Sequence, residues 1–156
     1  MGKGMAPARH AMRRLARFRR LGRRDQLLLL QALLLLAVIR VGLKSLSLPR
    51  IMQLTQRPLP LRFESMSPSQ IGWAVAMASR YVPGAACLTQ ALAAQVLLNG
   101  VGISTALRIG VAKEGDDLAA HAWLESDGTV IFGDSHPEYF TPLPHLLVRR
   151  GVTDQK

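Results

Sequence analysis

Three residues of the chain have side chains that together suit nucleophilic catalysis: Cys87, His121 and Asp134. A cysteine thiolate attacks a carbonyl carbon, an imidazole transfers the proton, and a carboxylate holds the imidazole in the required tautomer. Cys87 is the only cysteine in the sequence, which excludes an internal disulfide and a multi-cysteine zinc site. These residue types, in this chain order, predict a covalent acyl-transfer site.

The residues around the cysteine predict that it opens a helix. Pro83 and Gly84 end the preceding element, apolar residues then recur one turn apart, and Gly100 is a natural stop, so we expect a helix over residues 87–99. A helix N-terminus carries partial positive charge and free N–H groups. It therefore favours the thiolate of Cys87, and the backbone N–H of this residue is suited to stabilise an oxyanion.

The histidine lies in a predicted β-hairpin. Asp127-Gly128 is a strong turn signal, and it stands between predicted strands at residues 120–125 and 129–132. An earlier strand is expected over residues 105–111. With helices first and a short antiparallel sheet after them, the order predicts an α+β fold.

A two-residue type I′ turn would fix the register of this hairpin. It pairs Trp123 with Phe132 and His121 with Asp134, whose Cβ atoms would lie about 5 Å apart. Strand alternation puts Trp123, Phe132, His121, Asp134 and Glu125 on one face. The imidazole and the carboxylate are then expected to form a hydrogen bond.

Each of these residues also has a structural interpretation. Cys87 fits a small buried core position, His121 a hydrogen-bonded structural histidine, and Asp134 a turn or a helix cap. Asp116 and Asp117 are alternative partners of the imidazole, although they lie in a polar loop before it.

A metal site is a weaker alternative. His136 and His145 could join Cys87 and His121 as ligands, but no close-spaced pair on a helix or knuckle supports zinc. We expect no metal and no cofactor.

Charge divides the chain at residues 62/63. Residues 1–62 hold 14 Lys/Arg and a single acid, Asp25, whereas residues 63–156 hold six Lys/Arg and nine acids. The net charge of +10 therefore belongs to a basic, leucine-rich N-terminal helical extension, and the candidate site belongs to the second part. With 5% aromatic residues the chain offers little base-stacking surface, and nucleic acid is not expected as a partner.

The apolar run at residues 27–39 predicts a helix. It falls short of the roughly 20 residues of a membrane span, and no signal-peptide cleavage site follows it. We expect a largely enclosed helix that packs on the domain or on a partner, with peripheral membrane contact as the alternative. Prolines then punctuate a connecting region with one short helix between Pro49 and Pro58, and Ser67-Pro68 begins the next helix.

Four segments around the candidate site resemble a known family; they are Tyr81-Val82-Pro83-Gly84-Ala85-Ala86-Cys87-Leu88, Leu107-Arg108-Ile109-Gly110-Val111, Ala120-His121-Ala122-Trp123-Leu124 and Gly133-Asp134. They are similar to the lasso-peptide biosynthesis B2 proteins, which are leader peptidases with a transglutaminase-like core. The similarity is specific over residues 72–143 and looser over Arg24-Asp25-Gln26-Leu27 and the leucine-rich run.

The resemblance implies a cysteine peptidase that removes the leader of a ribosomally made precursor, with Cys87, His121 and Asp134 as its triad. A single cysteine suits a reducing interior, so we expect a cytoplasmic location. It implies a separate winged-helix leader-recognition protein of the B1 type, because residues 1–62 are too short to be that domain. It also implies a cyclase related to asparagine synthetase. Tyr81 stands where a papain-like enzyme has its oxyanion-hole Gln, so the second oxyanion donor is unassigned.

Two other classes stay open at the sequence level. The same triad suits a transglutaminase-like acyl transferase, in which an amine replaces water. A basic binding module with a structural cysteine and histidine is the non-enzymatic alternative. The extension is expected to dock the recognition protein or the leader.

Overall fold

The computed structural model describes residues 18, 21–57, 66–114, 117–133 and 139–143. The helices in these ranges are α2 (Arg23–Ser45), α3 (Leu48–Thr55), α4 (Pro68–Ser79) and α5 (Cys87–Gly100). The strands are β1 (Ala106–Glu114), β2 (Asp117–Ser126), β3 (Thr129–Phe132) and the two-residue β4 (Thr141–Pro142). Helices precede strands, as predicted.

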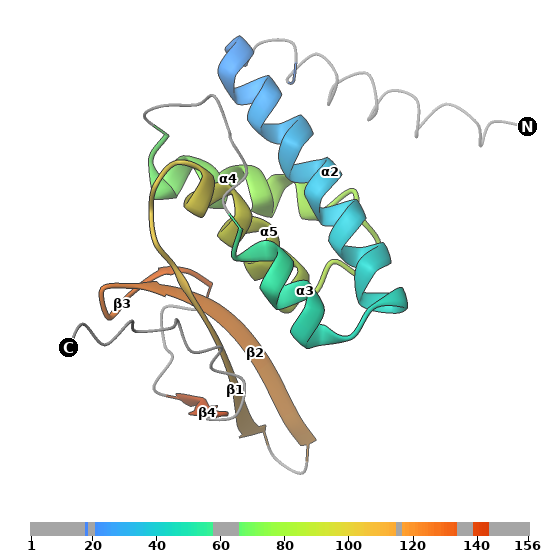
Figure 1. Cartoon of the computed structure of the whole chain (residues 1–156), viewed down its shortest axis with the longest axis vertical. Coiled ribbons are helices and arrows are strands. Elements are labelled where there is room, and N and C mark those ends of the chain that lie inside the picture. The colour runs from blue at the N-terminus through green and yellow to red at the C-terminus, as the bar shows by residue number, and fades with distance from the viewer. Residues whose placement is uncertain (1–17, 19–20, 58–65, 115–116, 134–138, 144–156) are drawn as a thin grey trace, which may run out of the picture.

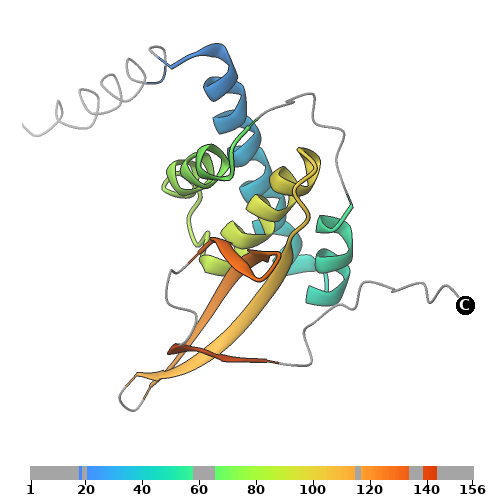
Figure 2. The same ribbon diagram turned by 90° about the vertical axis from the view of Figure 1, so that its left-hand side faces the viewer.

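The strands form one antiparallel sheet in the order β3-β2-β1-β4. Figures 1 and 2 show the helices gathered over one end of the long β1–β2 hairpin, while the other end projects beyond them. The predicted α+β fold, with helices packed on a short antiparallel sheet and a helix at its N-terminal side, is confirmed.

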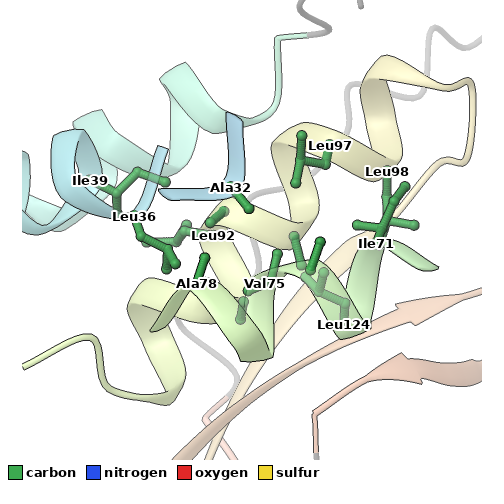
Figure 3. Packing of buried hydrophobic residues seen from close by; sticks show 14 of the residues in the cluster. Ala32, Leu36, Ile39, Ile71, Val75, Ala78, Leu92, Leu97, Leu98 and Leu124 are labelled. Carbon is green, nitrogen blue, oxygen red and sulfur yellow. The ribbon is translucent and has the colours of Figure 1, made fainter. Parts of the chain in front are cut away.

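Helix α5 lies at the centre of the core. Its apolar residues pack against α2, α3, α4 and the inner face of the sheet. Figure 3 shows Leu36 and Ile39 of α2 close to Leu92 of α5 and Ala78 of α4. Helices α2 and α3 thus share one core with the segments beyond residue 66, and the division at residue 62 stays a prediction.

Helix α2 differs from its prediction in two ways. It is 23 residues long rather than 13, and its most apolar 18-residue window has a mean hydropathy of 2.2, so by length and composition it could cross a membrane. Core helices and signal sequences reach the same values, and these numbers assign it no membrane role. Only 22% of that window is buried, so the described chain does not enclose the helix, and packing of its outer face on a partner stays a prediction.

The hairpin turn is confirmed, and its register is partly wrong. Asp127 and Gly128 have φ of 49° and 78°, as a type I′ turn requires. The register then shifts in β3, where Ile131 is an extra residue, so that Phe132 pairs with Leu124 instead of Trp123. A one-residue shift turns a side chain to the other face. Phe132 therefore packs on the helical side of the sheet.

Candidate active site

Cys87 is the first residue of α5, as the sequence predicts. Ala86 precedes it with an extended backbone and provides no side-chain cap, so nothing from that side chain competes for the first-turn N–H groups. The thiol is partly exposed, and its Sγ lies 3.8 Å from the carbonyl oxygen of Ala120 on β2. The N-terminus of α5 is thus seated directly against the strand that carries the histidine.

The loop before Cys87 is held by helix α2. The Nε of Arg40 donates a hydrogen bond to the carbonyl oxygen of Pro83 at 3.4 Å. The next residue, Gly84, has a φ of 72°, and a Cβ there would lie 2.6 Å from the Arg40 guanidinium. Glycine at this position therefore permits both the backbone turn and the close approach of α2.

His121 lies on β2 within an aromatic stack. Its ring is 5.2 Å from the ring of Phe140 and 6.4 Å from that of Trp123, with interplanar angles of 29° and 15°. Gly110 lies opposite His121 on β1, and a Cβ there would come within 2.8 Å of Phe140 and 2.9 Å of Trp123. The missing side chain of Gly110 makes room for the rings that flank the imidazole.

A network of hydrogen bonds holds the Trp123 ring of this stack in place. The indole Nε1 of Trp123 donates to one carboxylate oxygen of Glu125 at 2.9 Å, and Arg108 Nε donates to the other at 2.8 Å. Burial raises the pKa of Glu125, but the hydrogen bonds from Trp123 and Arg108 and the charge of Arg108 outweigh it and lower this pKa below its ordinary value. Glu125 is thus anionic at neutral pH and anchors the indole. His121, Trp123 and Glu125 share one face, as predicted.

The two described members of the predicted triad line one open pocket of about 580 Å³. Its walls come from α4, the start of α5, and the edge of the sheet where β3 ends; they are Gly72, Ala76, Cys87, Gln90, His121, Ala122, Ile131, Phe132 and Gly133. Residues 34 positions apart in the sequence are therefore brought to the same cavity. The smaller residues, above all glycine and alanine, leave the pocket open beside the thiol.

Gln90 is a pocket residue that the sequence reasoning missed. It lies one turn after Cys87, and its side-chain amide donates to the carbonyl oxygen of Ala85 at 2.8 Å. An amide nitrogen carries two hydrogens, so one more N–H is left for another acceptor. A polar residue three positions after a candidate nucleophile was the available signal, because that spacing puts both on one helix face.

The remaining predicted site residues fall outside the described parts of the chain. They are Asp134, Asp116, His136 and His145. The backbone of Asp117 is described, and it begins β2 rather than lying in a loop. Four steps of about 3.3 Å along the strand, roughly 13 Å in all, separate its backbone from that of His121, so it is poorly placed as the partner of the imidazole. Within the described ranges, no three His, Cys, Asp or Glu side chains cluster as a metal site.

A thiol at a helix start, seated against an antiparallel sheet whose strand carries an imidazole, defines the papain-like and transglutaminase-like class of cysteine enzymes. Comparison with known families agrees with this class, because the Transglutaminase-like superfamily matches residues 30–145. The chain belongs to this superfamily, which includes cysteine peptidases and acyltransferases. Searches of curated proteins and of solved structures gave no match.

Proposed function

We propose that the protein is a cysteine peptidase that removes the leader of a ribosomally made lasso precursor peptide. The observation that carries the proposal is the pocket shared by Cys87 and His121. Membership of the transglutaminase-like superfamily supports the thiol chemistry. The sequence resemblance to the lasso-peptide B2 proteins supports the choice of substrate.

The proposed reaction has two halves. The thiolate of Cys87 attacks the carbonyl carbon at the leader–core junction, and the backbone N–H of Cys87 and the amide of Gln90 stabilise the oxyanion. The C–N bond then breaks as protonated His121 gives its proton to the leaving amine of the core peptide. Water, deprotonated by His121, attacks the thioester, and the leader leaves as a carboxylic acid while the thiol is restored. Asp134 is the proposed partner of the imidazole.

The shape of the pocket suits a peptide substrate. It is open, and α4 faces it with the small residues Gly72 and Ala76, so an extended chain can approach the thiol without meeting large side chains from α4. No lysine or arginine is among the described residues that line the pocket. Recognition of the leader is therefore assigned to a partner, the separate winged-helix protein of the B1 type.

The other proposed partner is a cyclase related to asparagine synthetase, which would act on the freed core peptide. Both partners, and action in the cytoplasm, are proposals that the family resemblance supports. A single cysteine suits a reducing compartment.

The test is cleavage of a precursor peptide in the presence of the recognition protein, followed by mass spectrometry. The wild type is expected to release the leader with a free carboxylate, and Cys87→Ala to release none. Thr129→Ala, which changes the exposed end of the hairpin, is the matched control and should cleave normally. Cleavage by a folded Cys87→Ala variant would exclude the covalent mechanism.

An acyl transferase is the second candidate, because the superfamily contains such enzymes and the pocket is open enough to admit an amine. With an added primary amine, this activity would give a leader amide rather than the acid. A basic binding module would give neither product. In that case alkylation of Cys87 near neutral pH should be slow, as for an inert thiol.

A further inference from the structure

The outer face of α2 carries a continuous apolar stripe that no described part of the chain covers. Five aliphatic side chains recur on it every three or four residues, and all are about half exposed or more; they are Leu27, Leu30, Leu34, Val38 and Val41. Such spacing places them on one side of the helix, over a length of about 21 Å. Exposed apolar surface of this extent marks an interaction site.

The opposite face of α2 belongs to the core. Leu28, Ala32, Leu36 and Ile39 are buried in the core that α2 shares with α4 and α5. Figure 3 shows the last three of them. A transmembrane orientation would pull these four side chains out of the core and uncover α5. Helix α2 can therefore present its stripe to a partner only by lying flat against it.

Basic residues flank the stripe. Arg23 and Arg24 are exposed at its N-terminal end and Lys44 at its C-terminal end. In the sequence, residues 1–24 contain nine Lys/Arg, and Asp25 is the only acid up to residue 62. An aliphatic stripe among cations is complementary to a surface that combines negative charge with hydrocarbon.

We propose that the outer face of α2 docks on the surface of an anionic lipid bilayer, with the aliphatic side chains in the headgroup–acyl boundary and the basic residues among the headgroups. The stripe contains no aromatic residue, whereas protein interfaces draw their main anchors from Trp, Tyr and Arg. Its side chains have no hydrogen-bonding groups to match to a partner protein. A lipid surface requires neither feature.

The experiment is sedimentation of the purified full chain with vesicles. Vesicles of phosphatidylcholine with 30% phosphatidylglycerol should bind the protein at least tenfold more tightly than vesicles of phosphatidylcholine alone. Raising the salt concentration should weaken the binding. Equal binding to both vesicles, or binding to neither, would overturn the proposal.

Two matched variants locate the surface. The double variant Leu34→Gln and Val38→Gln changes only exposed side chains of the stripe, so it should stay folded while losing at least tenfold in vesicle affinity. Leu118→Gln removes a still more exposed leucine, on β2, and should bind as the wild type does. Circular dichroism confirms that each variant is folded. Unchanged vesicle binding of the double variant would contradict the proposal, because it would show that the basic residues bind the vesicles without the apolar stripe of α2.

The remaining outcomes identify other occupants of the stripe. Resistance of the bound protein to extraction at high pH would indicate a spanning helix and contradict the flat orientation. A dimer, or a complex with the recognition protein, that the double variant abolishes while vesicle binding is unaffected would assign the stripe to protein instead. Cys87→Ala should bind vesicles as the wild type does, so failure of the peptidase proposal would leave this result unchanged.

Discussion

Helices α2 and α5 are both rich in apolar residues, yet their surroundings differ. In α5, nine of 14 residues are buried, and they form the run Thr89 and Ala91–Leu98. In α2, four of 23 are buried, all on one side. Apolar composition alone did not distinguish them, because it describes the side chains and says nothing of what lies against them.

The difference follows from residue size and position in the chain. Alanines at positions 91, 93 and 94 let neighbours approach α5 closely, so α2, α4 and the sheet surround it. The leucines of α2 extend outwards on the side where the described chain has no further element. The enclosed helix α5 can fix the position of the Cys87 thiol, whereas the half-exposed helix α2 can bind a partner.

The largest expected effect is on the free energy of unfolding, when a leucine of α5 is shortened and the result is compared with the same change in α2. Leu92→Ala in α5 should lower the free energy of unfolding by about 2–5 kcal/mol, because it leaves a cavity in the core. Leu34→Ala on the outer face of α2 should change it by no more than about 0.5 kcal/mol. Denaturant unfolding measures both. Similar losses would mean that the outer face of α2 is covered in solution.

The second prediction concerns the first turn of α5. Gln90→Ala should lower kcat for precursor cleavage by about 10²-fold, with little change in KM, if its amide stabilises the oxyanion. The alkylation rate of Cys87 should stay the same, which shows that the thiol is intact. A raised KM with an unchanged kcat would instead make Gln90 a substrate-binding residue.

The third prediction tests the link between the two helices. Gly84→Ala and Gly102→Ala both force a left-handed backbone on alanine, at a cost of about 1–2 kcal/mol. Space is open at Gly102, whereas the new Cβ at residue 84 meets Arg40. Only Gly84→Ala should also slow precursor cleavage, by severalfold. Adding Arg40→Ala to Gly84→Ala should restore the cleavage rate, because the new Cβ then no longer meets the guanidinium. If Gly102→Ala slowed cleavage equally, the contact with Arg40 would not be the cause of the slowing.

The smallest expected effect is a pH dependence of stability at Glu125 on the sheet, which the enclosed helix α5 should not show. None of the fully buried described side chains is ionisable, so the loss from Leu92→Ala should be equal at pH 7 and pH 4. Glu125 has a lowered pKa in the folded protein, so its contribution is present above its ordinary pKa of 4.5 and is lost as the pH falls through the folded value. Glu125→Gln should therefore cost up to about 1 kcal/mol at pH 7 and progressively less below pH 4.5. A cost that is independent of pH would show that the charge of Glu125 contributes nothing.

Local signals predicted much of this architecture. Pro83-Gly84 before Cys87 gave the start of α5, and Asp127-Gly128 gave the turn. The bulge at Ile131 has no comparable signal, because an extra residue is accommodated by tertiary packing, here of Phe132 on the helical side of the sheet. A register counted outwards from the turn therefore held for two pairs, Ser126–Thr129 and Glu125–Val130, and failed at the third.

The site was predictable only where it is local. Cys87 and His121 follow from residue type and the elements that carry them. Contributions from Phe140, Gly110 and Arg40 arise from segments that meet only in the folded chain. Residue spacing cannot predict such tertiary contacts, because they depend on how the elements pack.

The stack of His121 on Trp123 has one practical consequence. The indole of Trp123 lies beside the imidazole, so its emission is a built-in optical reporter of changes around that ring. The chain has only one other tryptophan, and Trp73→Phe would silence it. Fluorescence of that variant would then follow changes at this stack, without substrate or label.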